Sequence, residues 1–325
     1  MGVALELKKG SYKVGDMVAT REAYGKALLE LGEIDQDVVV LDADLSGSTQ
    51  TKHFAKAFPE RFFNMGIAEN NMIGVAAGLA RAGKKPFASS FAMFASGRAW
   101  EFVRNSVAHN HLCVRVCATH SGLTVGEDGA SHQIIEDIAI MRVIPEMQVL
   151  VPADAQEAYQ MIYASMNFTK PTYIRLGRAK VATIFDESLK FELGKAQVIT
   201  QGDKATLVAC GVMTSRAYEA AQELKNKGID VELINCSSIK PLDHQTIITS
   251  LEKTGKLITI EEHNVLAGMG DAVIAAVSEN SDINFKVKKM GVNDQFGQSG
   301  PAMQVLDHYG LAASDIIREV EEIIK

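Results

Sequence analysis

Apolar runs typical of strands alternate with helical patterns along the first half of the chain, and this alternation constrains the fold more than any other feature. The run VVVLDAD at 38–44 is representative, because it is rich in β-branched residues and ends in carboxylates. The expected strands are residues 38–44, 62–68, 84–91, 112–120, 147–154 and 171–178. The expected helices are residues 15–32, 70–82, 92–109, 133–141 and 155–167. Such alternation predicts an α/β domain with a mostly parallel sheet flanked by helices.

Two of the expected helix ends carry specific signals. Gly83 follows the helix expected at 70–82 and is a candidate C′ glycine. Asp154 precedes the helix expected at 155–167 as a candidate N-cap, with Glu157 three residues on as its capping-box partner.

A second α/β series follows the charged segment FDESLKFELGK at 185–195, which has no apolar period. Its expected strands are residues 205–210, 230–235, 257–261 and 285–290. Its expected helices are residues 215–227, 243–254, 269–279 and 313–324. We therefore place a boundary near residue 190 and expect two domains, 1–190 and 191–325, which a chain of 325 residues is long enough to form.

Composition and charge narrow the class of protein. Apolar residues make up 47% of the chain and charged residues 22%, as in ordinary soluble globular proteins. The net charge of -7 argues against a general nucleic-acid binder, because phosphate backbones attract basic surfaces. No stretch has the roughly 18 apolar residues of a membrane helix, and the start MGVALELKKG lacks the pattern of a secretory signal. We expect no nucleic-acid partner, no membrane partner and a cytoplasmic location.

Neither the cysteines nor the glycine motifs indicate a metal or nucleotide site. The four cysteines form no C-x-x-C pair and no His/Cys cluster, so buried thiols in a reducing compartment explain them best. We expect no metal ligands in this chain. The segment GMGDAV at 268–273 begins like a dinucleotide fingerprint, but Val273 stands where the third glycine would fall. A tight turn before a helix is the better explanation.

Polar residues gather where the expected elements end, which is where α/β proteins place their sites. The places are Thr20-Arg21, DADLSGST at 42–49, Glu69, SSFAMF at 89–94, THSGLTVGEDGASHQ at 119–133 and Arg178. Segment 119–133 is the richest, and a purely structural loop has no use for its two histidines and two carboxylates. Glu69 alone is equally compatible with a solvated or helix-capping glutamate. Phe91 and Phe94, three residues apart, would ordinarily be core residues.

Taken together, these motifs resemble the second half of transketolase, from about residue 12 to the C-terminus. The matching segments are GIAENNM, FASSFAMF, THSGLTVGEDGASHQ, TYIRLGR and, further on, EEHNVLAGMGDAV. VGEDGASHQ is specific to transketolase and its close relative deoxyxylulose phosphate synthase. The resemblance implies a thiamine-diphosphate pyrimidine-binding domain at 1–190 and a transketolase-type C-terminal domain at 191–325.

The resemblance also implies the cofactor, thiamine diphosphate, and the residues that hold its pyrimidine end. Glu69 matches the catalytic carboxyl group that shares a proton with N1′ of the aminopyrimidine ring. Phe91 and Phe94 match positions that hold this ring, with Phe94 as the stacking candidate. Asp44 matches a carboxylate near the cofactor. Gly97 departs from the family, where a tyrosine is common, so we expect one wall of the pocket to be smaller or filled from elsewhere.

The substrates implied by the resemblance are sugar phosphates. Four residues match family positions that hold them: Arg21, Ser48, His120 and Arg178. Arginine suits this task because its planar fork meets a phosphate with two hydrogen bonds. Asp128 matches a residue that contacts the C2 hydroxyl of the substrate. His132 matches a histidine beside the donor's C1 hydroxyl and carbonyl oxygen, and we expect it to be catalytic.

One part of the family pattern is missing from this sequence. Thiamine-diphosphate enzymes hold the diphosphate through a metal bound by Gly-Asp-Gly and a later Asn, but each Gly-Asp here lacks the second glycine. The resemblance therefore implies the second subunit of a split transketolase. The N-terminal partner subunit would bring the diphosphate-binding domain and the ligands of Mg²⁺ or Ca²⁺. We expect an α2β2 assembly, with homodimer contacts, that transfers a two-carbon ketol unit from a ketose phosphate to an aldose phosphate.

Three alternatives stay open at the level of the sequence. The β subunit of a 2-oxo acid dehydrogenase has the same two-domain plan but no need of Arg21, His120 and Arg178 for a sugar phosphate. A non-catalytic regulatory subunit would not need the acid at Glu69. A deoxyxylulose phosphate synthase-like enzyme shares the VGEDG loop and is the hardest to separate.

Overall fold

The computed structural model describes residues 12–325, so the segment MGVALELKKG and the beginning of the domain expected at 1–190 lie outside the described residues. Two compact units divide the chain. The first unit holds the described residues up to Ser121 together with Ile140–Glu192. The second holds Gly122–Ala139 and Leu193–Lys325. Part of the segment that we found richest in polar groups therefore belongs to the second unit.

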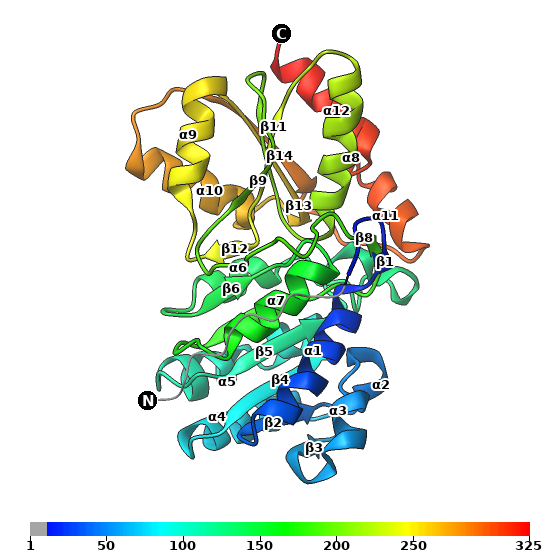
Figure 1. Cartoon of the computed structure of the whole chain (residues 1–325), viewed down its shortest axis with the longest axis vertical. Helices are drawn as coiled ribbons and strands as arrows, with labels where there is room; N and C mark the ends of the chain where they lie inside the picture. Colours follow the sequence, from blue (N-terminus) through cyan, green and yellow to red (C-terminus); the bar gives the residue numbers. More distant parts are fainter. Residues whose placement is uncertain (1–11) are drawn as a thin grey trace. The chain divides into compact units, whose positions relative to one another are not determined.

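The first unit is built on a parallel sheet (Figure 1). Its strands lie in the order β6-β7-β5-β4-β2-β3, and each neighbouring pair in this series is parallel. They are β2 (Val38–Asp42), β3 (Phe62–Asn64), β4 (Lys85–Phe91), β5 (Arg115–Thr119), β6 (Gln148–Leu150) and β7 (Thr172–Arg175). A short antiparallel ribbon pairs β1 (Met17–Val18) with β8 (Val181–Ala182). The prediction of a mostly parallel sheet is confirmed.

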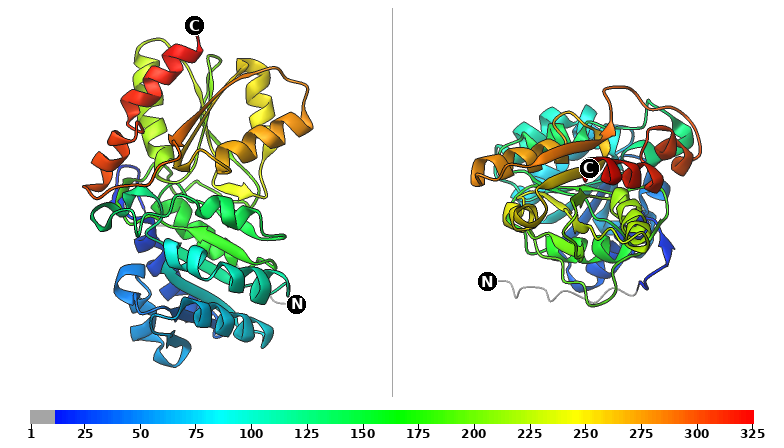
Figure 2. Two further views of the ribbon diagram at one scale, coloured as in Figure 1. Left: turned by 180° about the vertical axis from the view of Figure 1, so that it is seen from behind. Right: turned by 90° about the horizontal axis from the view of Figure 1, so that it is seen from above.

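Helices cover both faces of this sheet. They are α1 (Thr20–Ile34), α2 (Ser46–Thr49), α3 (Lys52–Ala57), η1 (Pro59–Arg61), α4 (Glu69–Arg81), η2 (Met93–Arg98), α5 (Trp100–Phe102), η3 (Val103–Ala108) and α7 (Ala155–Ser165). Figures 1 and 2 show α1 beside α7 on one face, and α4 with the η2-α5-η3 segment on the other. Helix α4 buries Met72, Ile73, Ala76 and Ala77, a spacing of three and four residues that forms one apolar stripe.

Helix α4 ends as expected. Gly83 lies in the left-handed region with φ of +87°, and its N–H donates to Ala80 O at 3.0 Å. The next N–H, of Lys84, donates to Leu79 O at 2.9 Å. These two bonds make a Schellman motif, which confirms Gly83 as the C′ residue.

Helix α7 begins at the expected N-cap, but one of its two hydrogen bonds differs from those of a standard capping box. The Asp154 side chain accepts a hydrogen bond from the N–H of Glu157 at 2.9 Å, which confirms the N-cap. The carboxylate of Glu157 accepts from the N–H of Ala153 at 2.7 Å, one residue before the cap. Asp154 also accepts from the N–H groups of Ile184 and Phe185, so the cap joins the helix to a distant segment.

The expected helix at 92–109 is helical but not regular. The N–H of Ala99 donates to Phe94 O, and the N–H of His109 donates to Arg104 O, which are both i→i−5 bonds. Such π-type turns are wider than α-helical turns and often occur at functional sites. They change the direction of the side chains around Phe94 and Arg98.

Several expected strands are shorter in the structure, including β5, β6 and β7, and three other elements differ mainly at one end. Residues 17–18 form β1, so the helix expected at 15–32 begins at Thr20. The strand expected at 62–68 stops at Asn64, because Gly66 has a φ of +65° and the chain turns before α4. The helix expected at 133–141 is α6 (Asp137–Arg142).

The second unit has a sheet of its own, in the order β14-β13-β10-β11-β9, in which only the β9–β11 pair is antiparallel among the described pairs. Its strands are β9 (Gln197–Thr200), β10 (Thr206–Ala209), β11 (Glu232–Asn235), β13 (Lys256–Asn264) and β14 (Lys286–Val292). Its helices are α8 (Val212–Asn226), α9 (His244–Thr254), α10 (Met269–Asn280), α11 (Ala302–His308) and α12 (Ala313–Ile323), with η4 (Leu123–Asp128). Figures 1 and 2 show α9 and α10 on one face, α8 and α12 on the other. Strands β9 and β12 (Ser238–Lys240) and helix α11 were not expected.

The GMGDAV segment is a helix start occupied by a side chain of the chain itself. Gly268 is the N-cap of α10, and the carboxylate of Glu261 accepts from the N–H groups of Met269 and Gly270 at 2.6 and 2.8 Å. A carboxylate thus sits where a phosphate would bind to a nucleotide fingerprint. This contact supports the expectation of a turn before a helix.

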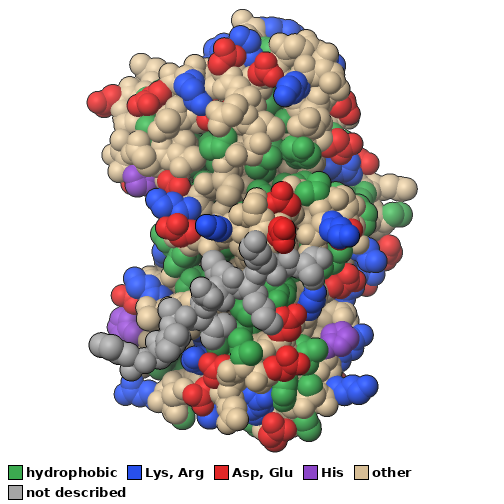
Figure 3. Space-filling model, in the orientation of Figure 1, with side chains coloured by type: hydrophobic (Ala, Val, Ile, Leu, Met, Phe, Trp, Pro, Cys, Tyr) green, Lys and Arg blue, Asp and Glu red, His purple; other side chains and the backbone are tan. Residues whose placement is uncertain are grey.

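The described surface is mixed in charge. Figure 3 shows acidic and basic side chains interspersed over the face in view. None of the helices in residues 12–325 combines the length and the apolar character that crossing a membrane requires.

Candidate active site

The expected site residues of the first unit gather at the carboxyl edge of its sheet. Four of them end or follow strands: Asp44, Phe91, His120 and Arg178. Because these strands are parallel, their carboxyl ends lie along one edge, where α/β proteins bind ligands. The N–H of Gly177 donates to Thr20 Oγ1 at 2.8 Å, which ties the first turn of α1, with Arg21, to the same edge.

Glu69 is the first residue of α4, and it is only 2% exposed. Within residues 12–325, its Oε2 is buried without a hydrogen-bond partner. Arg98 Nη1 lies 3.6 Å from Oε2, near enough for an ion pair but beyond a hydrogen bond. A buried carboxylate oxygen without a donor is costly. The burial of this oxygen therefore argues against a solvated glutamate.

Three aromatic rings lie in a row beside this carboxylate. The rings of Phe91 and His120 are stacked with centroids 3.9 Å apart, and those of Phe91 and Phe94 are nearly parallel at 6.2 Å. The guanidinium of Arg98 lies over the Phe94 ring at 5.7 Å. Since Arg98 also approaches Glu69, it connects the end of the aromatic row to the buried carboxylate.

Arg98 is a residue that the sequence analysis missed. It follows Gly97, the position where the family commonly has a tyrosine, and it lies in the π-type segment η2. The only signal in the sequence was the departure at Gly97 itself. The side chain of Arg98 is 57% exposed, so it is able to move away from Glu69 when a ligand enters.

Two arginines share the α1 end of the site. Arg21 donates from Nη1 to Ser48 O at 2.6 Å, while within the described residues its Nε is buried without a partner. Burial lowers the pKa of the Arg21 guanidinium, Glu22 partly opposes this change, and the positive charge of Arg178 adds to it. Two neighbouring guanidiniums repel each other unless an anion joins them. The contact with Ser48 uses its backbone oxygen, so the Ser48 hydroxyl is not part of this bond.

The turn that carries Asp44 and Ser48 is held by Asp42, which we had not singled out. Asp42 is fully buried and accepts from the N–H of Leu45 and from the hydroxyls of Thr49 and Thr51, at 2.6 to 2.9 Å. Burial raises the pKa of Asp42, and these hydrogen bonds oppose the rise. The signal in the sequence was the Asp-x-Asp pattern followed by hydroxyl residues.

Two expected site residues have unusual backbones. Asp44 has a φ of +63° and His120 a φ of +57°, both in the left-handed region. Non-glycine residues rarely adopt this region, and such strain clusters at functional sites. Asp44 is exposed and accepts from Asn64 Nδ2 at 2.9 Å, and His120 Nδ1 lies 3.0 Å from the hydroxyl of Thr119.

The remaining two expected residues belong to the second unit. Asp128 is exposed at the end of η4, before Gly129 with its φ of +72°. His132 is half-buried, and its Nδ1 lies 3.0 Å from the Ser131 hydroxyl.

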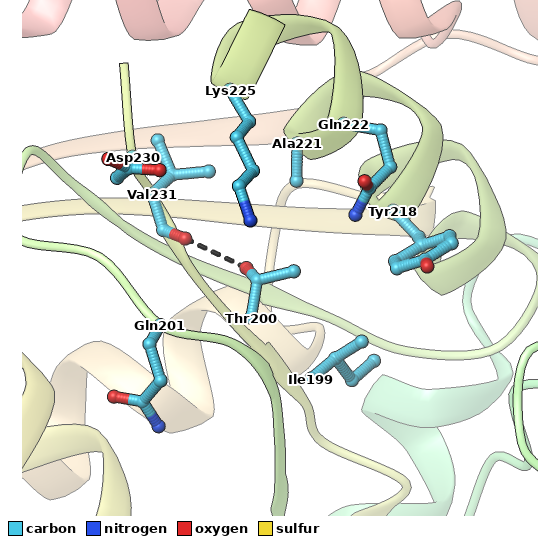
Figure 4. Close-up of a pocket in the computed structure, with 9 residues that line it drawn as sticks. All are labelled: Ile199, Thr200, Gln201, Tyr218, Ala221, Gln222, Lys225, Asp230 and Val231. Carbon is cyan, nitrogen blue, oxygen red and sulfur yellow. Dashed lines mark hydrogen bonds between the residues drawn. The ribbon is translucent and has the colours of Figure 1, made fainter. Parts of the chain in front are cut away.

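A hollow of about 280 Å³ lies elsewhere in the second unit (Figure 4). Tyr218, Gln222 and Lys225 of α8 line one side, and Thr200 of β9 lines another. The Thr200 hydroxyl donates to Val231 O at 2.8 Å, as the dashed line in Figure 4 marks.

The fold and the site define an α/β protein with a candidate ligand site at the carboxyl edge of a parallel sheet, around one buried acid. Comparison with known families identifies it further. Residues 16–183 match the family described as "Transketolase, pyrimidine binding domain", and residues 194–316 match "Transketolase, C-terminal domain". The chain belongs to the transketolase family.

Three relatives illustrate the range of this similarity. A "Putative transketolase C-terminal section" of Methanocaldococcus jannaschii is 47% identical, over 94% of this chain and 96% of the relative. "Transketolase-like protein 2" of Mus musculus is 41% identical over 96% of this chain, which spans only 50% of that relative. The "6-deoxy-6-sulfo-D-fructose transketolase subunit SqwH" of Clostridium sp. is 38% identical, over 93% of this chain and 94% of the relative.

A solved structure is also similar. "Split gene transketolase, inactive beta4 tetramer" is 50% identical, covers 94% of this chain and 98% of its own, and superposes with a TM-score of 0.87. These comparisons do not favour a deoxyxylulose phosphate synthase, a 2-oxo acid dehydrogenase subunit or a regulatory protein.

The first unit fits the pyrimidine end of thiamine diphosphate. The buried Oε2 of Glu69 lacks a donor within residues 12–325, and a protonated ring nitrogen is such a donor. The flat faces of Phe91 and Phe94 suit an aromatic ring. Within the same residues, no group of three or more His, Cys, Asp and Glu side chains is arranged to hold a metal ion.

Proposed function

We propose that this chain is the subunit of a two-chain transketolase that provides the pyrimidine side of the active site. The observation that carries the proposal is the buried, unpaired carboxylate oxygen of Glu69 beside the aromatic row. The reaction moves a two-carbon ketol unit from a ketose phosphate to an aldose phosphate. Thiamine diphosphate, when bound, supplies the electron sink that allows the bond beside a ketose carbonyl to break.

In this proposal the residues of the chain orient the cofactor and handle protons. Glu69 holds a proton between its carboxyl group and N1′ of the aminopyrimidine. Phe91 and Phe94 fix the plane of the ring, and Arg98 moves from Glu69 as the ring enters. Asp44 lies near the cofactor at the end of β2, where the Asp42 turn holds the backbone.

The substrate residues of the proposal divide by task. The phosphate end of the sugar lies against Arg21, Ser48, His120 and Arg178. The mutual repulsion of the two arginines supports this assignment, because an anion would relieve it. Asp128 contacts the C2 hydroxyl of the sugar, and His132 the C1 hydroxyl and carbonyl oxygen of the donor.

The partner in this proposal is an N-terminal transketolase subunit that carries the diphosphate-binding domain and the Mg²⁺ or Ca²⁺ ligands, in an α2β2 assembly with homodimer contacts. Relatives of similar length support it, since their names describe a C-terminal section, a subunit, and an inactive tetramer of β chains. The domain boundary near residue 190 is part of the same proposal. Four free cysteines favour a reducing compartment such as the cytoplasm.

Reconstitution tests the proposal. The chain is mixed with an N-terminal subunit that contains Gly-Asp-Gly and its later Asn, with thiamine diphosphate and Mg²⁺, and ketol transfer is compared with oxo-acid decarboxylation. Ketol transfer is expected only when both chains are present. Ketol transfer by this chain alone would refute the split active site, and decarboxylation without transfer would favour the dehydrogenase alternative.

The variant Glu69→Gln tests the central residue. It should lower turnover by about two to four orders of magnitude, as expected for loss of a general acid–base group, while circular dichroism and assembly stay unchanged. The matched control is Glu101→Gln, the same substitution at an exposed glutamate. A Glu69→Gln enzyme with normal turnover would contradict the proposed role.

A further inference from the structure

The segment 122–135, which we call the substrate loop, folds with the second unit although it follows a strand of the first. Its base is closed by the N–H of Gly122, which donates to Ile134 O at 3.0 Å. Leu123 and Ile135 are fully or almost fully buried in the hydrophobic core of the second unit. The loop is thus anchored by its two ends in that core.

Side chains and backbone of the C-terminal half complete the anchoring. The N–H of Asn264, at the end of β13, donates to Ile135 O at 2.8 Å. The side chain of Gln133 donates to Leu123 O and Gly126 O inside the loop, and to Gln298 O at 3.0 Å. Gln298 belongs to the segment between β14 and α11, so this one amide group joins the loop to that segment.

The side chain of Glu262, in β13, also contacts the substrate loop. It is 3% exposed, and its Oε1 accepts a hydrogen bond from the N–H of Thr124. Gly122 has a φ of +71°, and a Cβ at this position would overlap the Glu262 carboxyl group. The absence of a side chain at Gly122 therefore lets a buried carboxylate approach the loop backbone, and a buried carboxylate requires such donors.

The neighbouring Glu261 provides an internal comparison. It is equally buried, but its carboxylate accepts from Met269 and Gly270 at the start of α10. Consecutive residues of a strand face opposite sides of the sheet. One glutamate therefore holds a helix on one face, while the next holds the substrate loop on the other.

Two glycines show how closely the loop is fitted. A Cβ at Gly129 would overlap the hydroxyl of Ser299, and a Cβ at Gly297 would overlap the Gln133 side chain. Both contacts join the loop to the segment between β14 and α11. Asp128 and His132 lie between these anchored points.

From these contacts we infer that the C-terminal domain positions the substrate loop, with Glu262 as the principal positioning residue for Asp128 and His132. The inference rests on the proposed function, in which these two residues contact the sugar. Glu262 acts through the loop backbone and touches no reacting atom. Through this contact the C-terminal domain takes part in sugar binding, although Glu262 lies far along the sequence from Asp128 and His132.

Two measurements test the inference. Hydrogen–deuterium exchange on this chain alone reports the loop without any need for activity, and kinetics of the two-chain complex report sugar binding. Glu262→Ala should speed exchange in peptides covering 122–135 and leave peptides of α4 unchanged. In the complex it should raise KM for the ketose phosphate about tenfold or more, with a smaller change in kcat, as loss of a charge-assisted bond predicts. Glu262→Gln should restore most of the loss, because its amide oxygen still accepts from Thr124.

Gly297→Ala and Glu261→Gln complete the design. Gly297→Ala presses on Gln133 from the other side without changing charge, and it should act in the same direction as Glu262→Ala even if that variant folds poorly. Glu261→Gln should leave loop exchange and KM unchanged.

The inference is overturned if Glu262→Ala and Gly297→Ala leave loop exchange unchanged, or if they speed it while KM stays at the wild-type value. A wild-type complex without ketol transfer would contradict the proposed function instead, and the exchange measurement would still decide whether Glu262 anchors the loop.

Discussion

Glu69 buries a carboxylate oxygen that no donor within residues 12–325 satisfies, and folded chains rarely keep such an atom without compensation. Arg98 compensates this oxygen only in part, because its Nη1 lies 3.6 Å from Glu69 Oε2 and most of its side chain is in solvent. The unpaired oxygen thus lowers the stability of the isolated chain and favours binding of a donor. Such a cost in stability is expected where a residue serves binding, as proposed for Glu69.

Arg178 gives a prediction that separates phosphate binding from general damage. Arg178→Ala should raise KM for a ketose phosphate roughly thirtyfold, about 2 kcal/mol, because a charge-assisted hydrogen bond to the phosphate is lost. For the same ketose without its phosphate, the variant and the wild type should differ little. Steady-state kinetics with both substrates measures the difference.

The control for Arg178 is Lys180→Ala, which removes an exposed cation two residues away. It should change neither KM. If Arg178→Ala raised KM equally for both ketoses, Arg178 would have a structural role in the site and would not bind the phosphate.

Cys117 predicts a specific dependence of stability on pH. Burial raises the pKa of this thiol from 9.0 to about 12, while a hydrogen bond with Tyr24 and the charge of Arg115 oppose the rise. Because the thiol has the higher pKa in the folded chain, the unfolded chain loses this proton first as the pH rises. The contribution of the protonated thiol to stability is therefore complete below pH 9 and is lost as the pH rises toward 12. By pH 10, about 1.4 kcal/mol of unfolding free energy should be gone.

Urea unfolding of the wild type and of Cys117→Ala, at pH 8 and pH 10, checks this expectation. The variant should lose less stability over that range, by about the 1.4 kcal/mol assigned to the thiol. Equal losses in the two proteins would show that Cys117 ionises as easily in the folded chain as in the unfolded one.

At the scale of the element, alanine substitutions at two glycines, one inside helix α4 and one just after its C-terminus, should have opposite effects on stability. Gly83→Ala should destabilise by about 1–2 kcal/mol, because a left-handed backbone disfavours any Cβ even where space is open. Gly78 lies inside the helix, and a Cβ there would meet no atom of the described residues within 4 Å. Gly78→Ala should therefore stabilise by about 0.5–1 kcal/mol. Thermal or urea unfolding measures both, and effects of the same sign would contradict the assignment of these positions.

Elements were predictable from the sequence where local rules decide them. The strands of the first sheet follow from apolar runs, the end of α4 from a C′ glycine, and the start of α7 from an N-cap aspartate, and all of these signals act over a few residues. The π-type turns at Phe94 and Arg104 did not follow, because the helical period of the sequence does not reveal which carbonyl an N–H will choose. Strand β9 and helix α11 were missed, since their residues are only partly buried and their patterns are weak.

The candidate site was predictable to the extent that it uses strand ends. Asp44, Phe91, His120 and Arg178 follow from the parallel topology together with the family resemblance. Arg98 and Glu262 did not, because each owes its position to a contact with a residue far away in the chain. Such contacts leave no periodic trace in the sequence.

At the scale of the whole molecule, neither compact unit is one continuous stretch of the sequence. The segment Gly122–Ala139 leaves the first unit, joins the second, and the chain then returns to complete the first sheet with β6 and β7. The two units are therefore linked by more than one crossing of the backbone. A chain cut near residue 190 would separate the substrate loop from the core that buries Leu123 and Ile135. Under the proposed function, neither product should therefore bind sugar phosphates.

The last prediction concerns what the cofactor does to the complete assembly. In the proposed function this chain contacts only the pyrimidine end, while the diphosphate and its metal are held by the partner. Binding stabilises a folded protein by RT ln(1 + [L]/Kd), about 2.7 kcal/mol at a hundredfold excess over Kd. Thiamine diphosphate with Mg²⁺ should therefore raise the melting temperature of the two-chain complex and leave that of the isolated chain nearly unchanged. Glu69→Gln should reduce the shift of the complex, because a neutral amide oxygen accepts from a protonated ring nitrogen more weakly than a carboxylate does. A large shift for the isolated chain would mean that it binds the whole cofactor itself, and the division of the site between two polypeptides would have to be abandoned.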